Sequence, residues 1–285
     1  MHEISHLSYR NKAMNSKVIL YFFLILLTTF SSIFVLAHAS PPMDTTKQAE
    51  KIKQLFDASH VQGVIVINDQ GNISIYGNAV QRASTQYVPA STFKMLNALI
   101  GLENNKVTPD EIFLWDGKKR ALPAWEKNMT IGEAMRLSAV PVYQELARRI
   151  GLTLMQKEVK HAHFGNEKIG TKVDRFWLDG PLKITPIQES KFAYQLAYKQ
   201  LPFKKTTQEK VQRMLLILKK DSYKIYAKSG LGTDLKQKVG WLTGWIEQPN
   251  GKKIAFSLNI NVPSSIDLSL RERLVYRSLT ILNII

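Results

Sequence analysis

The sequence contains no cysteine, so no disulfide can stabilise the fold and its stability has to come from a hydrophobic core. Acidic residues are also scarce: 23 Asp and Glu stand against 39 Lys and Arg, which leaves a net charge of +16. A basic surface attracts anions. Because the lysines are scattered and no nucleic-acid motif is present, we expect a small carboxylate or the cell envelope as partner and no nucleic acid.

The remaining composition is that of an ordinary globular chain. Of the 285 residues, 45% are hydrophobic and 22% are charged, which fits one or two domains and excludes a disordered protein.

One long apolar run, residues 18–36, stands near the N-terminus. Positive residues precede it and the triplet Ala37-His38-Ala39 follows it, which is the order of a secretory signal peptide. The pattern predicts a signal peptide over residues 1–39 and a periplasmic mature chain over residues 40–285. An uncleaved membrane anchor is the alternative, because the run approaches spanning length. Ser and Thr residues dilute the run, and no cysteine offers a lipid attachment point, so we expect no stable membrane anchor after cleavage. Met14 is an alternative start.

Strand patterns occur at both ends of the mature chain, and helical periodicity fills the middle. The predicted strands cover residues 63–68, 73–76, 224–229, 239–247 and 253–261. The predicted helices cover residues 44–59, 91–103, 131–137, 142–150, 152–160, 186–199, 207–218 and 265–282.

This order predicts an α+β fold in one domain, with an antiparallel sheet flanked by the terminal helices and an inserted helical lobe. The sheet lobe would take residues 40–88 and 223–285, and the helical lobe residues 89–222. A cleft is expected where one lobe gives way to the other, close to Ser91.

Ser91 and Lys94 stand three positions apart at the predicted start of a helix. Residues i and i+3 share one face of a helix, with Cβ atoms about 5–6 Å apart, so the lysine amine can reach the serine hydroxyl. A nucleophile then has a base beside it, and the free amides of a helix N-terminus suit an oxyanion. Alone, the pair also fits a capped helix with a solvated lysine, because about one Ser-x-x-Lys is expected by chance in such a chain.

Two further stretches carry groups that suit the same site. Lys228, Ser229 and Gly230 lie at the end of a predicted strand and place an ammonium, a hydroxyl and a flexible backbone along a sheet edge, where an amide can bind by β-augmentation. A charged gatekeeper on an edge strand is the alternative. Ser138 stands between two predicted helices, where its hydroxyl can relay a proton or cap a helix.

The remaining candidates are single residues. Trp177 can form an apolar wall beside the amine, or it can be ordinary core. Arg271, in the last predicted helix, can bind a carboxylate in a bidentate fork, or it can be solvated. His161 and His163 alternate without a third ligand, so we expect no metal site.

Four motifs follow one another in the chain: Ser91-x-x-Lys94, Ser138-x-Val140, Phe164-Gly-Asn166 and Lys228-Ser-Gly230. In this order and spacing they resemble the class D β-lactamases, the oxacillinases. The likeness covers almost all of the mature chain. It is closest in residues 87–103, 133–149 and 176–186, which look like the carbapenem-hydrolysing branch of the class. Class A relatives carry Ser-Asp-Asn in the position of the second motif.

The resemblance implies a β-lactamase/transpeptidase fold, a β-lactam substrate and an acyl-enzyme on Ser91. It also implies that Lys94 reacts with carbon dioxide to give N6-carboxylysine, the general base, so carbon dioxide or bicarbonate is expected as a lysine modifier and no cofactor. An amine with an ordinary pKa near 10.4 must lose about three pKa units, roughly 4 kcal/mol of desolvation, to be neutral at pH 7. Val140 and Trp177 favour that loss.

By the same resemblance, Ser138 relays a proton to the leaving nitrogen and Trp177 steadies the carbamate. The backbone amides of Ser91 and Leu231 would form the oxyanion hole. The substrate carboxylate would be bound by Lys228, Ser229 and Arg271, beside Gly230.

Some positions depart from the family pattern. Phe164 stands where the class more often has Tyr, and Leu231 where the branch typically has Trp. Leu122 and Thr233 occupy positions where the branch places an aromatic residue and a Met that arch over the cleft. We therefore expect hydrolysis of penicillins, which gives antibiotic resistance, and leave carbapenems open.

Two other functions share the serine and the lysine. A β-lactam-binding sensor domain keeps its acyl-enzyme without turnover, but such sensors usually hang from several membrane helices. A cell-wall DD-peptidase would be expected to have Asn in place of Val140. An exported binding protein without chemistry does not explain the four motifs. We expect a monomer or a homodimer.

Overall fold

The computed structural model describes residues 45–234, 237–263 and 267–285, which belong to one compact unit. The predicted signal peptide lies outside the described residues and stays a prediction. Within the described part of the chain, no helix is both long enough and apolar enough to cross a membrane.

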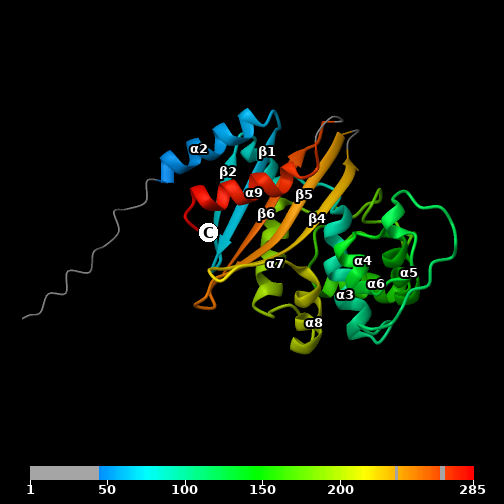
Figure 1. The fold of residues 1–285 in the computed structure, drawn as a ribbon. Coiled ribbons are helices and arrows are strands. Elements are labelled where there is room, and N and C mark those ends of the chain that lie inside the picture. The colour runs from blue at the N-terminus through cyan, green and yellow to red at the C-terminus, as the bar shows by residue number, and fades with distance from the viewer. Residues whose placement is uncertain (1–44, 235–236, 264–266) are drawn as a thin grey trace, which may run out of the picture. The chain divides into compact units, whose positions relative to one another are not determined.

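An antiparallel sheet with the strand order β2-β1-β6-β5-β4-β3 forms the centre of this unit (Figure 1). Its strands are β1 (Gly63–Asp69), β2 (Asn72–Gly77), β3 (Leu216–Lys219), β4 (Lys224–Asp234), β5 (Gln237–Glu247) and β6 (Lys253–Asn261).

The sheet is built from both ends of the described chain, because the N-terminal hairpin β1–β2 pairs with the C-terminal strand β6. The α-helices are α2 (Thr45–Ala58), α3 (Lys94–Glu103), α4 (Ile131–Arg136), α5 (Val140–Ile150), α6 (Leu152–His161), α7 (Pro186–Ala197), α8 (Lys205–Leu215) and α9 (Leu270–Ile281). The short 3₁₀ turns are η1 (Val80–Ser84), η2 (Ala90–Phe93) and η3 (Pro123–Trp125).

Helices cover both faces of the sheet. The terminal helices α2 and α9 pack on one face, over a core that includes Phe56, Ile65 and Leu274. On the other face α7 packs against β6, β1 and β5. The helices α3 to α6 pack against one another on the same side of the sheet (Figure 1). Because both faces are covered, β1 is buried from Gly63 to Asn68 and its apolar residues are continuous. The α+β fold and its antiparallel sheet are as predicted.

The prediction missed the strand β3, and several ends differ: β4 continues to Asp234 and α9 begins at Leu270. The helix expected over residues 207–218 ends at Leu215, and the apolar residues after it form β3, in which Leu216 pairs with Tyr226. A short Leu-Ile-Leu run fits a helix and a strand equally well, and the free edge of β4 decides the outcome. The helix α7, which the prediction grouped with the helical lobe, packs against β6, β1 and β5 as well as against α8.

Candidate active site

Ser91 lies in the 3₁₀ turn η2, and the helix α3 begins only at Lys94. The expectation that Ser91 itself opens the helix is therefore wrong by one turn. Ala90, directly before the serine, has φ of 51°, a left-handed value that is uncommon for residues with a Cβ. Two backbone bonds hold this conformation: Ala90 N–H donates to Trp177 O over 2.9 Å, and Thr92 N–H donates to Pro89 O over 3.2 Å.

Lys94 and Ser91 are in direct contact. The lysine Nζ donates to the serine Oγ over 2.7 Å, and the lysine side chain is fully buried. Burial, and then the positive charge of Lys228, hold the pKa of Lys94 well below its ordinary value. A neutral amine can accept a proton, so the pair has the geometry of a nucleophile with its base.

The outer edge of β4 runs past the serine. The strand β3 pairs with β4 only as far as Tyr226, and η2 packs against β4 beyond that point. A Cβ on Gly230 would stand 3.1 Å from Pro89 O, and one on Gly232 would stand 2.8 Å from Val88 Cγ2. The two glycines therefore allow the strand to approach the turn closely, with Leu231 between them. Lys228 to Gly230 lie in the middle of β4, not at its end as predicted.

Lys228 joins two of the predicted site hydroxyls. Its Nζ donates to Ser138 Oγ over 3.0 Å and to the Ser229 carbonyl oxygen over 2.8 Å, and it lies 3.5 Å from Ser229 Oγ. Burial, and then the charge of Arg271, lower the pKa of Lys228 to about 7. Ser138 has φ of 55° in the connection between α4 and α5, and Val140 is the first residue of α5. The second motif is thus connected to β4 by a side-chain hydrogen bond.

Arg271 reaches the same strand from α9. Its Nη1 donates to Gly230 O over 2.7 Å and its Nε donates to Leu268 O over 3.1 Å. Burial lowers its pKa, which the neighbouring Glu272 partly opposes. Two cations, Lys228 and Arg271, therefore stand at one stretch of β4 and can bind an anion there.

Trp177 is fully buried beside the turn. Its ring stacks on Phe93, with centroids 5.2 Å apart, and its indole Nε1 is buried and has no hydrogen-bond partner. Phe93 also meets Phe164 and Phe176 edge-on. An orphaned buried donor is unusual, because burying an N–H without a partner costs about 1–3 kcal/mol.

The third motif, Phe164-Gly-Asn166, packs against and hydrogen-bonds to the loop that carries Trp177. Phe164 is buried in the aromatic cluster, while the Asn166 side chain accepts from Lys183 N–H at 3.0 Å and donates to Pro181 O at 2.9 Å. These bonds connect the two ends of the loop. No reacting group is added by this motif.

Three of the four departures from the family pattern lie on the surface, while Phe164 is buried. Leu122 is 49% exposed, Leu231 is 41% exposed, and Thr233 is exposed. His161 and His163 lie next to Glu158 and Glu167, at 3.5 and 3.2 Å, and so each belongs to a separate pair.

Two polar residues next to the site did not figure in the prediction. Thr92, in η2, hydrogen-bonds to Glu189 of α7, which is fully buried. The periodicity of α7 carries the signal, because Glu189 shares a face with the core residues Phe192, Ala193 and Leu196.

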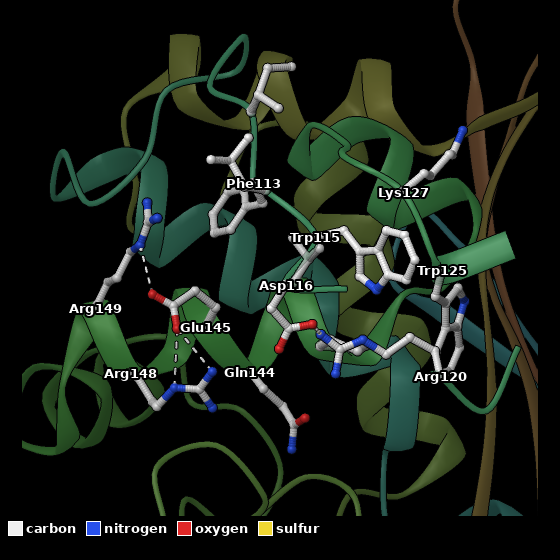
Figure 2. Close-up of a pocket in the computed structure, with 14 residues that line it drawn as sticks. Phe113, Trp115, Asp116, Arg120, Trp125, Lys127, Gln144, Glu145, Arg148 and Arg149 are labelled. Carbon is white, nitrogen blue, oxygen red and sulfur yellow. Dashed lines mark hydrogen bonds and ion pairs between the residues drawn. The ribbon is translucent and has the colours of Figure 1, made fainter. Parts of the chain in front are cut away.

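A cavity with a volume of about 620 Å³ lies between η3 and α5 (Figure 2). Trp115 and Trp125 line one wall of the cavity. On the opposite wall, Arg148 and Arg149 form ion pairs with Glu145. Trp125 connects the cavity to the second motif, since its Nε1 donates to Leu137 O over 3.0 Å. The cavity holds no nucleophile beside a base, so the reacting groups are those at Ser91.

The chain is similar to known proteins over most of its length. Residues 34–280 match the family model described as "Penicillin binding protein transpeptidase domain". The chain is 37% identical to Beta-lactamase OXA-10 of Pseudomonas aeruginosa, over 76% of this chain and 83% of that protein. It is 36% identical to Beta-lactamase OXA-48 of Klebsiella pneumoniae, over 74% and 80%.

A solved structure has the same fold. The class D β-lactamase FUS-1 (OXA-85) of Fusobacterium nucleatum subsp. polymorphum superposes with a TM-score of 0.79 at 35% identity, over 83% of this chain and 98% of that one.

Proposed function

The chain belongs to the class D β-lactamases, which are serine hydrolases, and we propose that it hydrolyses the β-lactam amide of penicillins through an acyl-enzyme on Ser91. The observation that carries the proposal is the 2.7 Å contact between a buried, pKa-lowered Lys94 amine and the Ser91 hydroxyl. A lysine whose pKa is lowered in this way can take the serine proton more readily than a solvated lysine, which stays charged at neutral pH.

We assign one residue or group to each step of acylation. Ser91 Oγ attacks the β-lactam carbonyl carbon, and its proton passes to the base at Lys94. The negative charge that develops on the carbonyl oxygen is stabilised by the backbone N–H groups of Ser91 and Leu231. Ser138, which accepts from Lys228 at 3.0 Å, relays a proton to the leaving nitrogen as the amide bond breaks.

Substrate binding falls to the edge of β4. The substrate amide pairs with this edge beside Gly230 and Leu231, as an added strand would. The substrate carboxylate binds to Lys228, Ser229 and Arg271. Charge-assisted hydrogen bonds of this kind contribute about 1.5–3 kcal/mol each.

The surroundings of Lys94 fit a carbamate on its Nζ. The pKa of the amine is lowered by burial, so the nucleophilic neutral form is available to carbon dioxide, and Trp177 Nε1 is a buried donor without a partner. Trp177 would hold the carbamate, and Val140 would keep its surroundings apolar. When present, the group supplies an anionic general base for acylation and deacylation, worth roughly 10²–10⁴-fold per step.

The proposed location is the periplasm, reached through a signal peptide over residues 1–39. The order of basic, apolar and small residues there supports it. Exposed Leu122, Leu231 and Thr233 support an open cleft, and so penicillins are the proposed main substrates.

The test is the steady-state hydrolysis of a penicillin and a carbapenem by the purified chain from Ser40 onward, with a D-Ala-D-Ala peptide as the third substrate. We expect many turnovers on the penicillin and none on the peptide. The S91A variant should be inactive, while S84A, at an exposed serine, should be as active as the unmodified chain. A single stoichiometric burst would instead indicate a β-lactam sensor, and cleavage of the peptide a DD-peptidase.

A further inference from the structure

A fully buried carboxyl group lies behind the catalytic turn, and the mechanism above does not use it. Glu189, on α7, places Oε1 in a hydrogen bond with Thr92 Oγ1. Its other oxygen, Oε2, is buried and has no hydrogen-bond partner. Thr92 is the neighbour of Ser91 in η2, so the carboxyl is one residue away from the nucleophile.

Counting protons decides the direction of this hydrogen bond. Thr92 Oγ1 contacts two oxygens, Glu189 Oε1 and, at 2.8 Å, the carbonyl oxygen of Pro89. A hydroxyl has one proton and can donate to only one of them. If Glu189 is a carboxylic acid, it donates to Thr92 and Thr92 donates to Pro89 O, so that every contact is a hydrogen bond. If Glu189 is a carboxylate, one contact lacks a proton and a charged oxygen is buried without a partner.

The electrostatics agree with the proton count. Burial raises the pKa of Glu189 to about 8, against which the Thr92 hydrogen bond acts in the opposite direction. No charged group contributes to this shift. The elements packed against α7 and η2 carry these charged groups: Arg82 on η1, Asp69 on β1, Lys238 and Glu247 on β5, Lys253 on β6, Lys94 and Glu103 on α3, Lys224, Lys228 and Asp234 on β4, and Lys205, Glu209, Lys210 and Arg213 on α8.

Several of those groups have partners of their own. Arg82 donates to Asn259, and Asp69 pairs with Lys252 at 2.7 Å. Lys94 donates to Ser91 and Lys228 donates to Ser138. The Glu189 carboxyl is therefore governed by burial and by Thr92.

The turn needs this support because its backbone is strained. Ala90 has φ of 51°, and such a conformation persists only when the surrounding structure fixes it. We propose that Glu189 is a positioning residue, which donates its carboxylic acid proton to Thr92 and thereby fixes η2 and the direction of the Ser91 hydroxyl. Thr92 passes the constraint to Pro89 O, on the other side of Ala90.

Two measurements test the protonation without any substrate. The infrared spectrum of E189Q is subtracted from that of the unmodified chain, both at pH 6. The difference is expected to contain the C=O stretch of a protonated carboxylic acid, because E189Q has lost this group. The folded-state pKa is above the ordinary 4.5, so the folded protein binds more protons than the unfolded one between about pH 4.5 and 8. Its stability therefore falls as the pH rises through this window, and E189Q avoids the loss.

The melting temperature of the unmodified chain should fall relative to E189Q by about 3 °C for each pH unit over that window. The control E50Q removes the same charge at an exposed position of α2 and should show no such trend. An infrared spectrum without the carboxylic acid band, or a temperature difference independent of pH, overturns the protonated state.

The positioning role of Glu189 is tested by measuring kcat. This measurement rests on the proposed function. E189M removes the donor at similar volume and T92V removes the relay, so both should lower kcat by about 10–100-fold with little change in KM, since a displaced nucleophile reacts slowly. E189Q keeps a donor and should restore kcat. Retention of full kcat in E189M and T92V overturns the role. If the unmodified chain itself has no turnover, the proposed function fails, while the infrared and melting results still decide the protonation.

Discussion

Nζ of Lys94 donates a 2.7 Å hydrogen bond to Oγ of Ser91, and the two side chains are 0% and 8% exposed. Burial and the charge of Lys228 both favour the neutral amine at this position. The amine is therefore ready to accept the proton of the hydroxyl that it contacts, or to react with carbon dioxide.

Removing the base should trap the acyl-enzyme. K94A is expected to acylate slowly on Ser91 and to lower turnover by roughly 10²–10⁴-fold, because one general base serves both steps. Mass spectrometry of the variant with a penicillin should show one covalent adduct that persists. K191A, at an exposed lysine of α7, is the control and should turn over normally. Normal turnover by K94A would refute the role of Lys94.

Removing the unpaired indole N–H of Trp177 should destabilise the carbamate on Lys94. W177F keeps a ring to stack on Phe93 but has no N–H, so it is expected to need roughly 10–150-fold more bicarbonate for half-maximal activity, the equivalent of a charged hydrogen bond. The measurement is kcat against added bicarbonate after removal of dissolved carbon dioxide. W115F removes the donor of an exposed Trp and should match the unmodified chain. An unchanged bicarbonate requirement in W177F would exclude this role.

Removing the guanidinium at β4 should impair substrate binding. R271A loses the 2.7 Å bond to Gly230 O together with a cation for the carboxylate, and kcat/KM for a penicillin should fall roughly 10–150-fold, mainly through KM. Arg273, two positions on, pairs with Asp267 at 3.0 Å, and R273A is the matched control. Equal kinetics for the two variants would place the carboxylate elsewhere.

The affinity for substrate should depend on pH through Lys228. Its pKa is lowered from 10.5 to about 7, so the folded protein loses this charge as the pH rises through 7. KM should then rise by up to about tenfold per pH unit above 7. K228R stays charged and should flatten this rise, while K224R, on the same strand and paired with Glu247, should not. Identical KM profiles for K228R and the unmodified chain would contradict the assignment.

Lys228 should also affect stability. Between pH 7 and 10.5 the unfolded chain binds more protons at this residue than the folded chain does, so its contribution to the free energy of unfolding increases with pH in this window. Glu189 acts in the opposite direction at lower pH, between about 4.5 and 8.

Local patterns made much of this structure predictable. The hairpin of β1 and β2 follows from two β-branched runs around Gln70-Gly71, and the helix α7 follows from Thr185 and Pro186 with a capping box. The contact between Ser91 and Lys94 follows from their i, i+3 spacing, which one turn of 3₁₀ helix preserves as well as α-helix does.

Contacts between distant segments could not be predicted. Leu216 begins a strand only because Tyr226 offers a free edge, and the sequence around it fits a helix equally well. Helical periodicity places Glu189 on the core face of α7, but its partner Thr92 is 97 positions away and only the fold brings the two together. The bond between Lys228 and Ser138 joins residues 90 positions apart, and only the fold brings them together.

The most direct test of the account is the turnover of a chromogenic cephalosporin by the purified chain from Ser40 onward, with and without added bicarbonate. We expect many turnovers per molecule and a rise in rate with bicarbonate. A single stoichiometric burst that does not respond to bicarbonate would contradict both hydrolysis through Ser91 and the carbamate on Lys94.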